Sequence, residues 1–304
     1  MIINRNKQKS FTLIELLVVI VIIGILAGVM MISTSSSIDK ANFAKAQAFS
    51  STVQEELLSN LVSEWAFDNA SNIGEDTWGN NNGTLYNFAN PATSISGLAN
   101  ASECVFGTCL RFDGANDYVD TNTYFKGGNK TISLWVNPSN VLDDYNGILG
   151  DWWWSADTGG EQDNLGLHLN KVYSRSFSDD TNIEGGLEHS NYNVVANSWL
   201  YIVLVTSQTS ALYLNGSNII SNAIVITGEN HLKTILIGIW RAGGTAGLSR
   251  PFNGLIDDVR IYDIALTSAQ IKQNYIAGLD SLLSKGMISS EDYDNKIAKL
   301  AEKE

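Results

Sequence analysis

The chain has 304 residues, a formal net charge of -13 and a sequence pI of about 4.6. This acidity argues against a nucleic-acid-binding protein, because such proteins displace the counterions of phosphate groups with clustered basic side chains. Length alone allows one or two domains.

The N-terminal segment joins a short basic leader to an apolar stretch. Residues 1–10 carry only basic charges, at Arg5, Lys7 and Lys9. As a helix rising about 1.5 Å per residue, the apolar residues 11–32 would cross a bilayer core of roughly 30 Å. Glu15 is the one charged residue in this stretch, and a charge within a membrane usually has a partner. That argues against the alternative, an ordinary signal anchor. Cleavage between Ser10 and Phe11 would create an amino terminus one helical turn from Glu15. The free amine of a neighbouring subunit could then neutralise the Glu15 carboxylate.

The stretch "KSFTLIELLVVIVIIGILA" resembles the N-terminal segment of type IV prepilins and type II secretion pseudopilins, over about residues 5–35. The resemblance implies that a prepilin peptidase cuts before Phe11, that Phe11 is N-methylated, and that Glu15 guides docking between subunits. Two features depart from the family pattern. Ser10 stands where Gly usually precedes the cut, and the apolar segment has no Pro, which leaves Gly24 as its most easily melted point.

A long helix is predicted to continue past the apolar stretch. Residues 33–65 contain no Pro or Gly, and their apolar residues recur at steps of three to five. That spacing indicates an amphipathic helix. We therefore assign residues 1–10 to a cleaved leader and residues 11–62 to one long helix, in membrane over about 11–32.

Residues 63–276 have the pattern of an all-β domain. Short runs such as "TISLWVNP", "WLYIVLVTS" and "TILIGIW" show partial alternation and are rich in β-branched and aromatic residues, with Asn, Gly, Asp or Ser between them. Many short strands at this spacing indicate an antiparallel sandwich or jelly roll. The Asn-Gly pair in "LYLNGSNI" predicts a tight hairpin turn.

These runs resemble the laminin-G-like, concanavalin A-like jelly-roll family. The resemblance is carried by "WAFD", "LRFDGANDYVD", "TISLWVNP", "LYLNG" and "FNGLIDDVRIYDIALTSAQIKQNY", over about residues 63–275. It implies a mostly noncatalytic domain that binds carbohydrate or protein at a cell surface, often with bound calcium. The last motif predicts a closing strand and then a helix, with Thr267 as N-cap and Gln270 completing a capping box.

Two family-motif acids are candidate calcium ligands. Asp257 would share the face of Leu255, Val259 and Ile261 in a regular strand, and a buried acid needs a partner. Asp68 in "WAFDN" could converge with it, because calcium takes several oxygen ligands. The alternative is that each carboxylate only accepts backbone N–H groups at a turn. The acidic residues between 151 and 163 are better explained as a solvated loop.

The stretch "GDWWWSADTGG" predicts a carbohydrate surface. In a strand Trp152, Trp153 and Trp154 cannot all face the core, so either Trp153 or the pair Trp152 and Trp154 faces outward. Exposed indoles beside carboxylates suit sugars, and Trp240 could join them. Burial of all four tryptophans is the alternative.

The cysteines and histidines give little sign of catalysis. Cys104 and Cys109, in "ECVFGTC", are too few for a disulfide framework, but they could form a local bridge in an oxidising compartment. Two free buried thiols are the alternative. The three histidines lack metal-ligand spacing, and no nucleophile elbow, phosphate loop or acidic hydrolase motif is present. We therefore expect no enzyme activity.

Residues 277–304 predict a helical hairpin. Leu279, Leu282 and Leu283 form one apolar stripe, Gly286 stops the first helix, and Ser289 or Ser290 caps the second. The segment resembles the short "SHOCT"-like C-terminal hairpins of bacterial membrane-associated proteins, which implies oligomerisation or docking. A solvated helical tail is the alternative.

Together these features predict a mainly β, pilin-like filament subunit. It would insert once into the cytoplasmic membrane with its head outside and then assemble with copies of itself or with other pilins. The head would bind surface carbohydrate or protein for adhesion. Two alternatives remain: a secretion pseudopilin whose head recognises an exported substrate, and a structural subunit without a ligand.

Overall fold

A computed structural model of the chain describes residues 57–90, 92–124, 129–141, 146–150, 162–178, 183–187, 192–207, 210–222, 234–241 and 248–301. The predicted processing residues Ser10, Phe11 and Glu15 and the apolar stretch 11–32 lie outside these ranges. Within the described ranges, no helix is both long and apolar enough to span a membrane.

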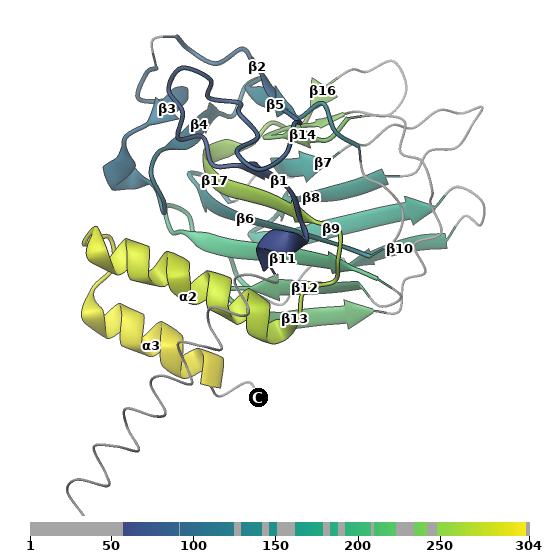
Figure 1. Cartoon of the computed structure of the whole chain (residues 1–304), viewed down its shortest axis with the longest axis vertical. Helices are drawn as coiled ribbons and strands as arrows, with labels where there is room; N and C mark the ends of the chain where they lie inside the picture. The colour runs from purple at the N-terminus through teal and green to yellow at the C-terminus, as the bar shows by residue number, and fades with distance from the viewer. Residues whose placement is uncertain are drawn as a thin grey trace, which may run out of the picture. The chain divides into compact units, whose positions relative to one another are not determined.

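The larger sheet of the head is antiparallel and forms one layer of a sandwich (Figure 1). Its strands are β1 (Leu61–Trp65), β3 (Gly97–Ala99), β4 (Cys109–Asp113), β6 (Lys130–Pro138), β11 (Leu200–Thr206), β12 (Ser210–Leu214), β13 (Ser217–Asn222) and β17 (Asn253–Tyr262). They follow the order β13-β12-β11-β6-β17-β4-β3, and β1 also pairs with β17. The closing strand of the chain therefore lies near the middle of the sheet, beside β6.

The smaller sheet forms the second layer and has the order β10-β9-β8-β7-β14-β5-β2. Its strands are β2 (Thr84–Tyr86), β5 (Tyr118–Asp120), β7 (Asn146–Gly150), β8 (Gln162–His168), β9 (Lys171–Ser178), β10 (Ile183–Leu187) and β14 (Leu236–Ile237). A separate pair joins β15 (Trp240–Arg241) to β16 (Leu248–Ser249). A short 3-10 helix, η1 (Ala101–Glu103), precedes β4.

Alternate residues of both sheets meet in one apolar core. On β6, Ile132, Leu134 and Val136 belong to this core, and the intervening residues point to the outer face of the larger sheet. The smaller sheet contributes apolar residues that include Val119, Leu149, Leu165, Leu167 and Ile237. This two-layer packing confirms the predicted all-β sandwich.

The predicted hairpin turn is confirmed between β12 and β13. Asn215 and Gly216 both have positive φ, 50° and 75°. Two such residues in succession match the twist of the flanking strands, which is why Asn-Gly pairs favour this turn.

Two helices follow the sandwich, α2 (Ser268–Ser284) and α3 (Ser290–Ala301). Thr267 caps α2 and forms the predicted capping box with Gln270. Ser289 caps α3, since its Oγ accepts from the backbone N–H of Asp292 at 3.0 Å. The predicted boundary at residue 276 falls inside α2, which continues to Ser284. The last motif of the sandwich and the first tail helix are therefore one element.

Helix α2 packs on the outer face of the larger sheet (Figure 1). The ring of Tyr275 stacks on that of Trp135 with centroids 5.7 Å apart. One turn along, the helix approaches so closely that a Cβ on Gly278 would lie 2.0 Å from Trp135 Cζ2. The Trp135 indole thus occupies the space that a side chain at position 278 would need, which explains a glycine inside this helix.

Replacing Gly278 with alanine tests this packing. Alanine favours a helix over glycine by about 1 kcal/mol, so propensity alone predicts a more stable protein. We expect the opposite, a loss of about 1–3 kcal/mol, because Trp135 must move to admit the methyl group. The measurement is thermal unfolding of the full chain in detergent. Ala277→Ser on the exposed side of the same turn serves as control, and an unchanged or raised melting temperature for Gly278→Ala would contradict the account.

Strand β17 departs from regular geometry in its "DD" pair. Asp258 has a φ of 51°, and the pairing with β6 shifts between Asp257 and Arg260. Ile256, Val259 and Ile261 face the core, so the bulge places Asp257 on the outer face. The prediction that Asp257 shares a face with Val259 and Ile261 assumed a regular strand, and it is wrong for that reason.

Candidate functional site

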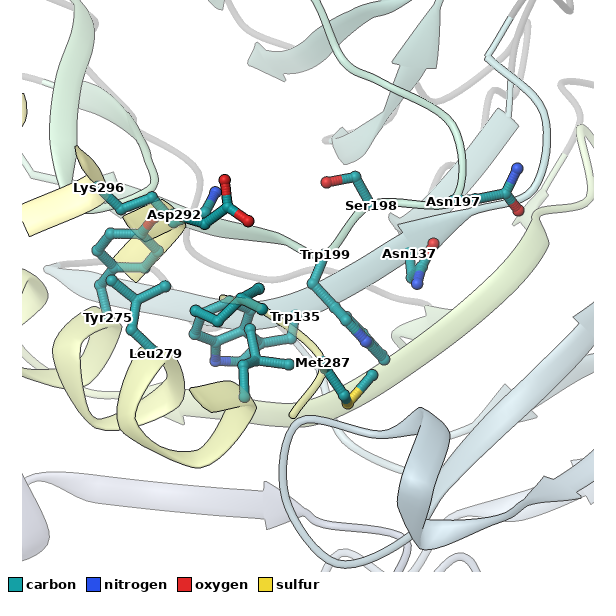
Figure 2. A pocket seen from close by; sticks show the side chains of 12 residues that line it. Trp135, Asn137, Asn197, Ser198, Trp199, Tyr275, Leu279, Met287, Asp292 and Lys296 are labelled. Atoms are coloured by element: carbon teal, nitrogen blue, oxygen red, sulfur yellow. The ribbon is translucent and has the colours of Figure 1, made fainter. Parts of the chain in front are cut away.

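A cavity of about 340 Å³ lies between the helical hairpin and the outer face of the larger sheet (Figure 2). Its walls come from the end of β6, the segment before β11, α2, the turn after α2, and α3. The lining residues are Trp135, Asn137, Asn197, Ser198, Trp199, Tyr275, Leu279, Leu282, Met287, Ile288, Asp292 and Lys296. This volume is at the small end of the roughly 300–1,000 Å³ typical of small-molecule sites.

The segment before β11 is folded back against the sheet. Asn197 adopts a φ of 58°, and its backbone N–H donates to the carbonyl of Pro138 at 2.7 Å. The turn places Ser198 at the surface and directs Trp199 inward. The indole Nε1 of Trp199 then donates to the carbonyl of Glu103 at 3.1 Å. The cavity wall is thus held from two sides by backbone carbonyls.

The cavity has an apolar floor and a polar mouth. Trp135 and Tyr275 are buried, whereas Asn197, Ser198 and Asp292 are exposed at the rim. Figure 2 shows Ser198 and Asp292 pointing toward each other from opposite sides of the mouth. Lys296 is half-buried one helical turn from Asp292. Burial, aided by Lys299 and opposed by Asp292, lowers the pKa of Lys296.

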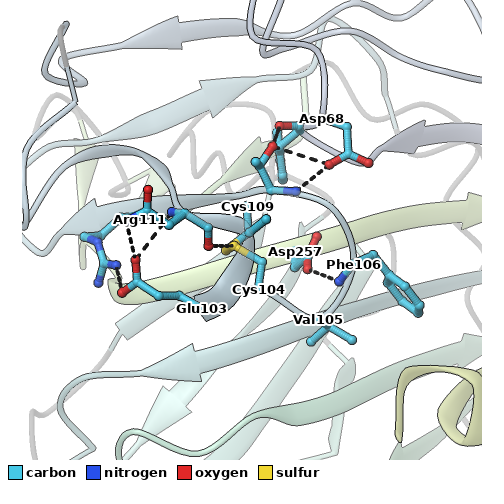
Figure 3. Close-up of a disulfide and its surroundings, with 12 residues drawn as sticks. Asp68, Glu103, Cys104, Val105, Phe106, Cys109, Arg111 and Asp257 are labelled. Carbon is cyan, nitrogen blue, oxygen red and sulfur yellow. Dashed lines mark hydrogen bonds and ion pairs between the residues drawn. A yellow bond between two sulfur atoms is a disulfide. The ribbon is translucent and has the colours of Figure 1, made fainter. Parts of the chain in front are cut away.

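A second site surrounds the disulfide between Cys104 and Cys109 (Figure 3). The loop that the disulfide closes crosses over β17, and the Asp257 Oδ2 atom accepts from the backbone N–H of Phe106 at 2.9 Å. Asp68 Oδ1 accepts from the N–H of Thr108 at 2.5 Å. Both predicted calcium ligands therefore hold the backbone of the disulfide loop, as the turn-capping alternative expects.

The two acids of β17 are costly to ionise. Burial, and then the neighbouring Asp258, raise the pKa of Asp257 well above its ordinary value, although the Phe106 N–H opposes this. The pKa of Asp258 is raised to about 6, again mainly by burial, while Arg260 opposes the shift. The Arg260 Nη2 atom lies 3.0 Å from Asp258 Oδ1. Asp258 thus has a cationic partner.

The Oδ1 atom of Asp257 is buried and makes no hydrogen bond within the described residues. An unpartnered carboxylate oxygen is a fitting ligand for a hard cation. However, the described residues contain no group of three or more His, Cys, Asp or Glu side chains able to hold a metal. Any calcium bound here would need backbone carbonyls or water as further ligands, and the calcium site stays a prediction.

The predicted tryptophan surface is only partly described. Trp152, Trp153 and Trp154 lie outside the described residues. Trp240 takes the buried alternative: it is 4% exposed, and its Nε1 donates to the carbonyl of Leu165 at 3.1 Å. Its ring also fills the space above two glycines, since a Cβ on Gly147 or Gly166 would come within 2.6 Å of it. The Trp240 ring is therefore a packing element of the head rather than an exposed sugar contact.

Comparison with known families identifies the head. A model of the Concanavalin A-like lectin/glucanases superfamily matches residues 113–272, which is more than half of the chain. The chain belongs to this superfamily. A second model, the Prokaryotic N-terminal methylation motif, matches residues 5–31 of the same lectin-like chain. Both predicted resemblances are thereby confirmed, while the likeness of the tail to SHOCT hairpins stays a prediction.

Solved structures share the fold of this lectin-like head. Domain 4 of AbnA, an extracellular arabinanase from Geobacillus stearothermophilus solved with arabinotriose, has a TM-score of 0.52 and 19% identity, over 70% of this chain and 97% of that one. The botulinum neurotoxin serotype D ligand binding domain, solved with N-acetylneuraminic acid, has a TM-score of 0.53 and 16% identity, over 75% and 53%.

The binding domain of Paraclostridial Mosquitocidal Protein 1 gives a TM-score of 0.53 and 19% identity, over 74% of this chain and 53% of that one. This chain therefore spans about half of the length of the two toxin domains. No curated protein matches the chain. At these identities the similarity shows the fold alone.

Proposed function

We propose that the chain is a type IV pilin-like filament subunit whose lectin-like head binds carbohydrate at the cell surface. The proposal is carried by one observation: a methylation motif over residues 5–31 and a concanavalin A-like domain over residues 113–272 occur in the same chain. The first implies membrane insertion and assembly, and the second implies a head built for binding.

Processing would follow the prepilin route. A prepilin peptidase cuts between Ser10 and Phe11, and Phe11 is then methylated. The subunit waits in the cytoplasmic membrane with its head outside, and Glu15 meets the new amine of a neighbouring subunit during assembly. The partners are therefore the peptidase and other copies of this chain or related pilins. An ion pair of this kind suits the membrane interior, where an unpaired charge costs several kcal/mol.

The head would be a noncatalytic adhesin. Two of the structurally similar domains were solved with a sugar bound, an arabinotriose and an N-acetylneuraminic acid. The stretch "DWWW" immediately after β7 supplies indoles for stacking on the apolar faces of sugar rings. Calcium bound near Asp257 and Asp68 would stabilise the head without taking part in any reaction.

Glycan binding by the full chain tests the adhesin proposal. The detergent-purified protein is applied to a glycan array as wild type, Trp153→Ala and the double variant Trp152→Ala with Trp154→Ala. We expect the variant that removes the outward face to lose glycan binding and to keep the wild-type melting temperature. Trp78→Ala is the control, because Trp78 is an exposed indole of the described head, with 47% of its surface exposed. A wild type that binds no glycan would remove the proposal.

A further inference from the structure

The cavity under the helical hairpin is lined by residues far in the sequence from the predicted tryptophan stretch 152–154. Residues 152–154 follow directly after β7, a strand of the smaller sheet. The cavity instead opens on the outer face of the larger sheet, between β6 and the two C-terminal helices. A ligand in the cavity would therefore contact described residues that are separate in the sequence from the tryptophan stretch.

The mouth of the cavity offers several polar side chains that make no hydrogen bond to the described residues. The side chains of Asn137, Asn197 and Ser198 make no hydrogen bond within the part of the chain that the structure describes. Each amide can both donate and accept, and the hydroxyl can do the same. Such groups, lining one small space, match the way in which binding sites orient a ligand rich in hydroxyl groups.

The charged groups at the mouth are balanced. Asp292 and Lys296 lie one turn apart on α3 and carry opposite charges, so the local net charge is zero. An anionic ligand would meet the Asp292 carboxylate and the overall charge of -13. A neutral ligand would meet no such repulsion. Its hydroxyl groups could donate a hydrogen bond to Asp292 and accept one from Lys296.

The inner wall is apolar and partly aromatic. Trp199 and Met287 lie side by side in Figure 2, and Ile288 also lines the space. A sugar ring has C–H groups on one face and hydroxyls around its edge, so it can use such a wall together with a polar rim. The volume of about 340 Å³ suits the terminal part of a glycan rather than a long polymer.

We infer that this cavity is a second glycan site and that it takes the terminal residues of a neutral glycan. This inference rests on the proposed function, since it requires a head that binds carbohydrate. Asn137, Asn197 and Ser198 bind the hydroxyls on one side, and Asp292 and Lys296 bind them on the other. Trp199 and Met287 contact the apolar face of the sugar. The helical hairpin thereby forms half of a binding site.

The test blocks the mouth in the detergent-purified full chain. Ser198→Trp places an indole at the exposed rim, where it fills the mouth without disturbing the core. Val195→Trp is the matched control, because Val195 belongs to the same segment, is 65% exposed and does not line the cavity. Both variants and the wild type are measured on an array of neutral hexose, N-acetylhexosamine and sialylated glycans, and by thermal melting.

We expect Ser198→Trp to lose at least about tenfold in affinity for a set of neutral glycans, with Val195→Trp and both melting temperatures unchanged. Neutral-glycan binding by Ser198→Trp equal to wild type would overturn this inference and leave the proposed function standing. Loss confined to sialylated glycans would overturn the assignment of a neutral ligand. A wild type that binds no glycan would overturn both proposals.

Discussion

Replacing Glu15 with valine is expected to abolish filament assembly while the subunit still reaches the membrane. The substitution makes the apolar stretch more hydrophobic, so membrane insertion is not impaired. It removes the acid that would neutralise the amine of a neighbouring subunit, and that amine would then enter the filament core unpaired, at a cost of several kcal/mol per subunit. The measurement compares the chain in sheared surface filaments with the chain in the membrane fraction.

Thr12→Val is the matched control, because it removes a polar side chain from the same apolar stretch and leaves Glu15 in place. Wild-type filament yield is expected for this control. Normal filaments from Glu15→Val would show that the acid has no part in assembly, and the pilin-like mechanism would then lose its physical basis.

Replacing Asp257 with asparagine is expected to stabilise the metal-free head at neutral pH, because burial makes this carboxylate costly to ionise. Asparagine keeps the shape of the side chain and an oxygen that can accept from the Phe106 N–H. It removes the need to bury a carboxylate whose Oδ1 atom has no hydrogen-bond partner within the described residues. The measurement is thermal or urea unfolding of the full chain in chelator.

The pH dependence of this effect has a definite sign. The pKa of Asp257 is raised in the folded state, so the folded chain binds a proton more tightly than the unfolded chain does. The contribution of Asp257 to stability is therefore retained below the unfolded pKa of about 3.9 and is lost as the pH rises from there toward the folded pKa. Wild type and Asp257→Asn should unfold alike at acidic pH and diverge as the pH increases.

Calcium separates the two interpretations of Asp257. If the cation binds there, excess calcium raises the melting temperature of the wild type and leaves that of Asp257→Asn unchanged. If the carboxylate only caps the disulfide loop, calcium has the same effect on both. An asparagine variant less stable than wild type in chelator would mean that the ionised carboxylate stabilises the loop.

Local patterns were sufficient to predict the layers and the ends of several elements. Partial alternation in "TISLWVNP" indicates a strand, and β6 confirms it, although both of its faces are buried, with Leu134 in the core and Trp135 under α2. The Asn-Gly turn and the Thr267 capping box depend on residues only a few positions apart. Short-range chemistry of this kind can be read from the sequence because no distant contact is needed to define it.

The bulge at Asp258 could not be predicted in the same way. Positive φ is uncommon outside glycine, and nothing in "LIDDVRIY" distinguishes an aspartate in that conformation from one in a regular strand. The positive φ of Asp258 turns the Asp257 side chain away from the core face and toward the disulfide loop. It depends on the pairing of β17 with β1, β4 and β6, which the sequence alone does not show.

The cavity is also a product of tertiary structure. Asn137, Ser198 and Lys296 come from three parts of the chain, and each is unremarkable in its own sequence context. Gly278, read alone, is a poor helix residue that weakens the prediction of a continuous α2. The reason for a glycine at this position is its close contact with Trp135, which only the tertiary structure shows.

The mature N-terminus of the subunit in isolated surface filaments tests the central claim most directly. Mass spectrometry should find a chain that begins at Phe11, carries one added methyl group on its amine, and continues into the lectin-like head. Filament-associated protein that still begins with the basic residues 1–10, or surface filaments that lack the chain altogether, would contradict the account.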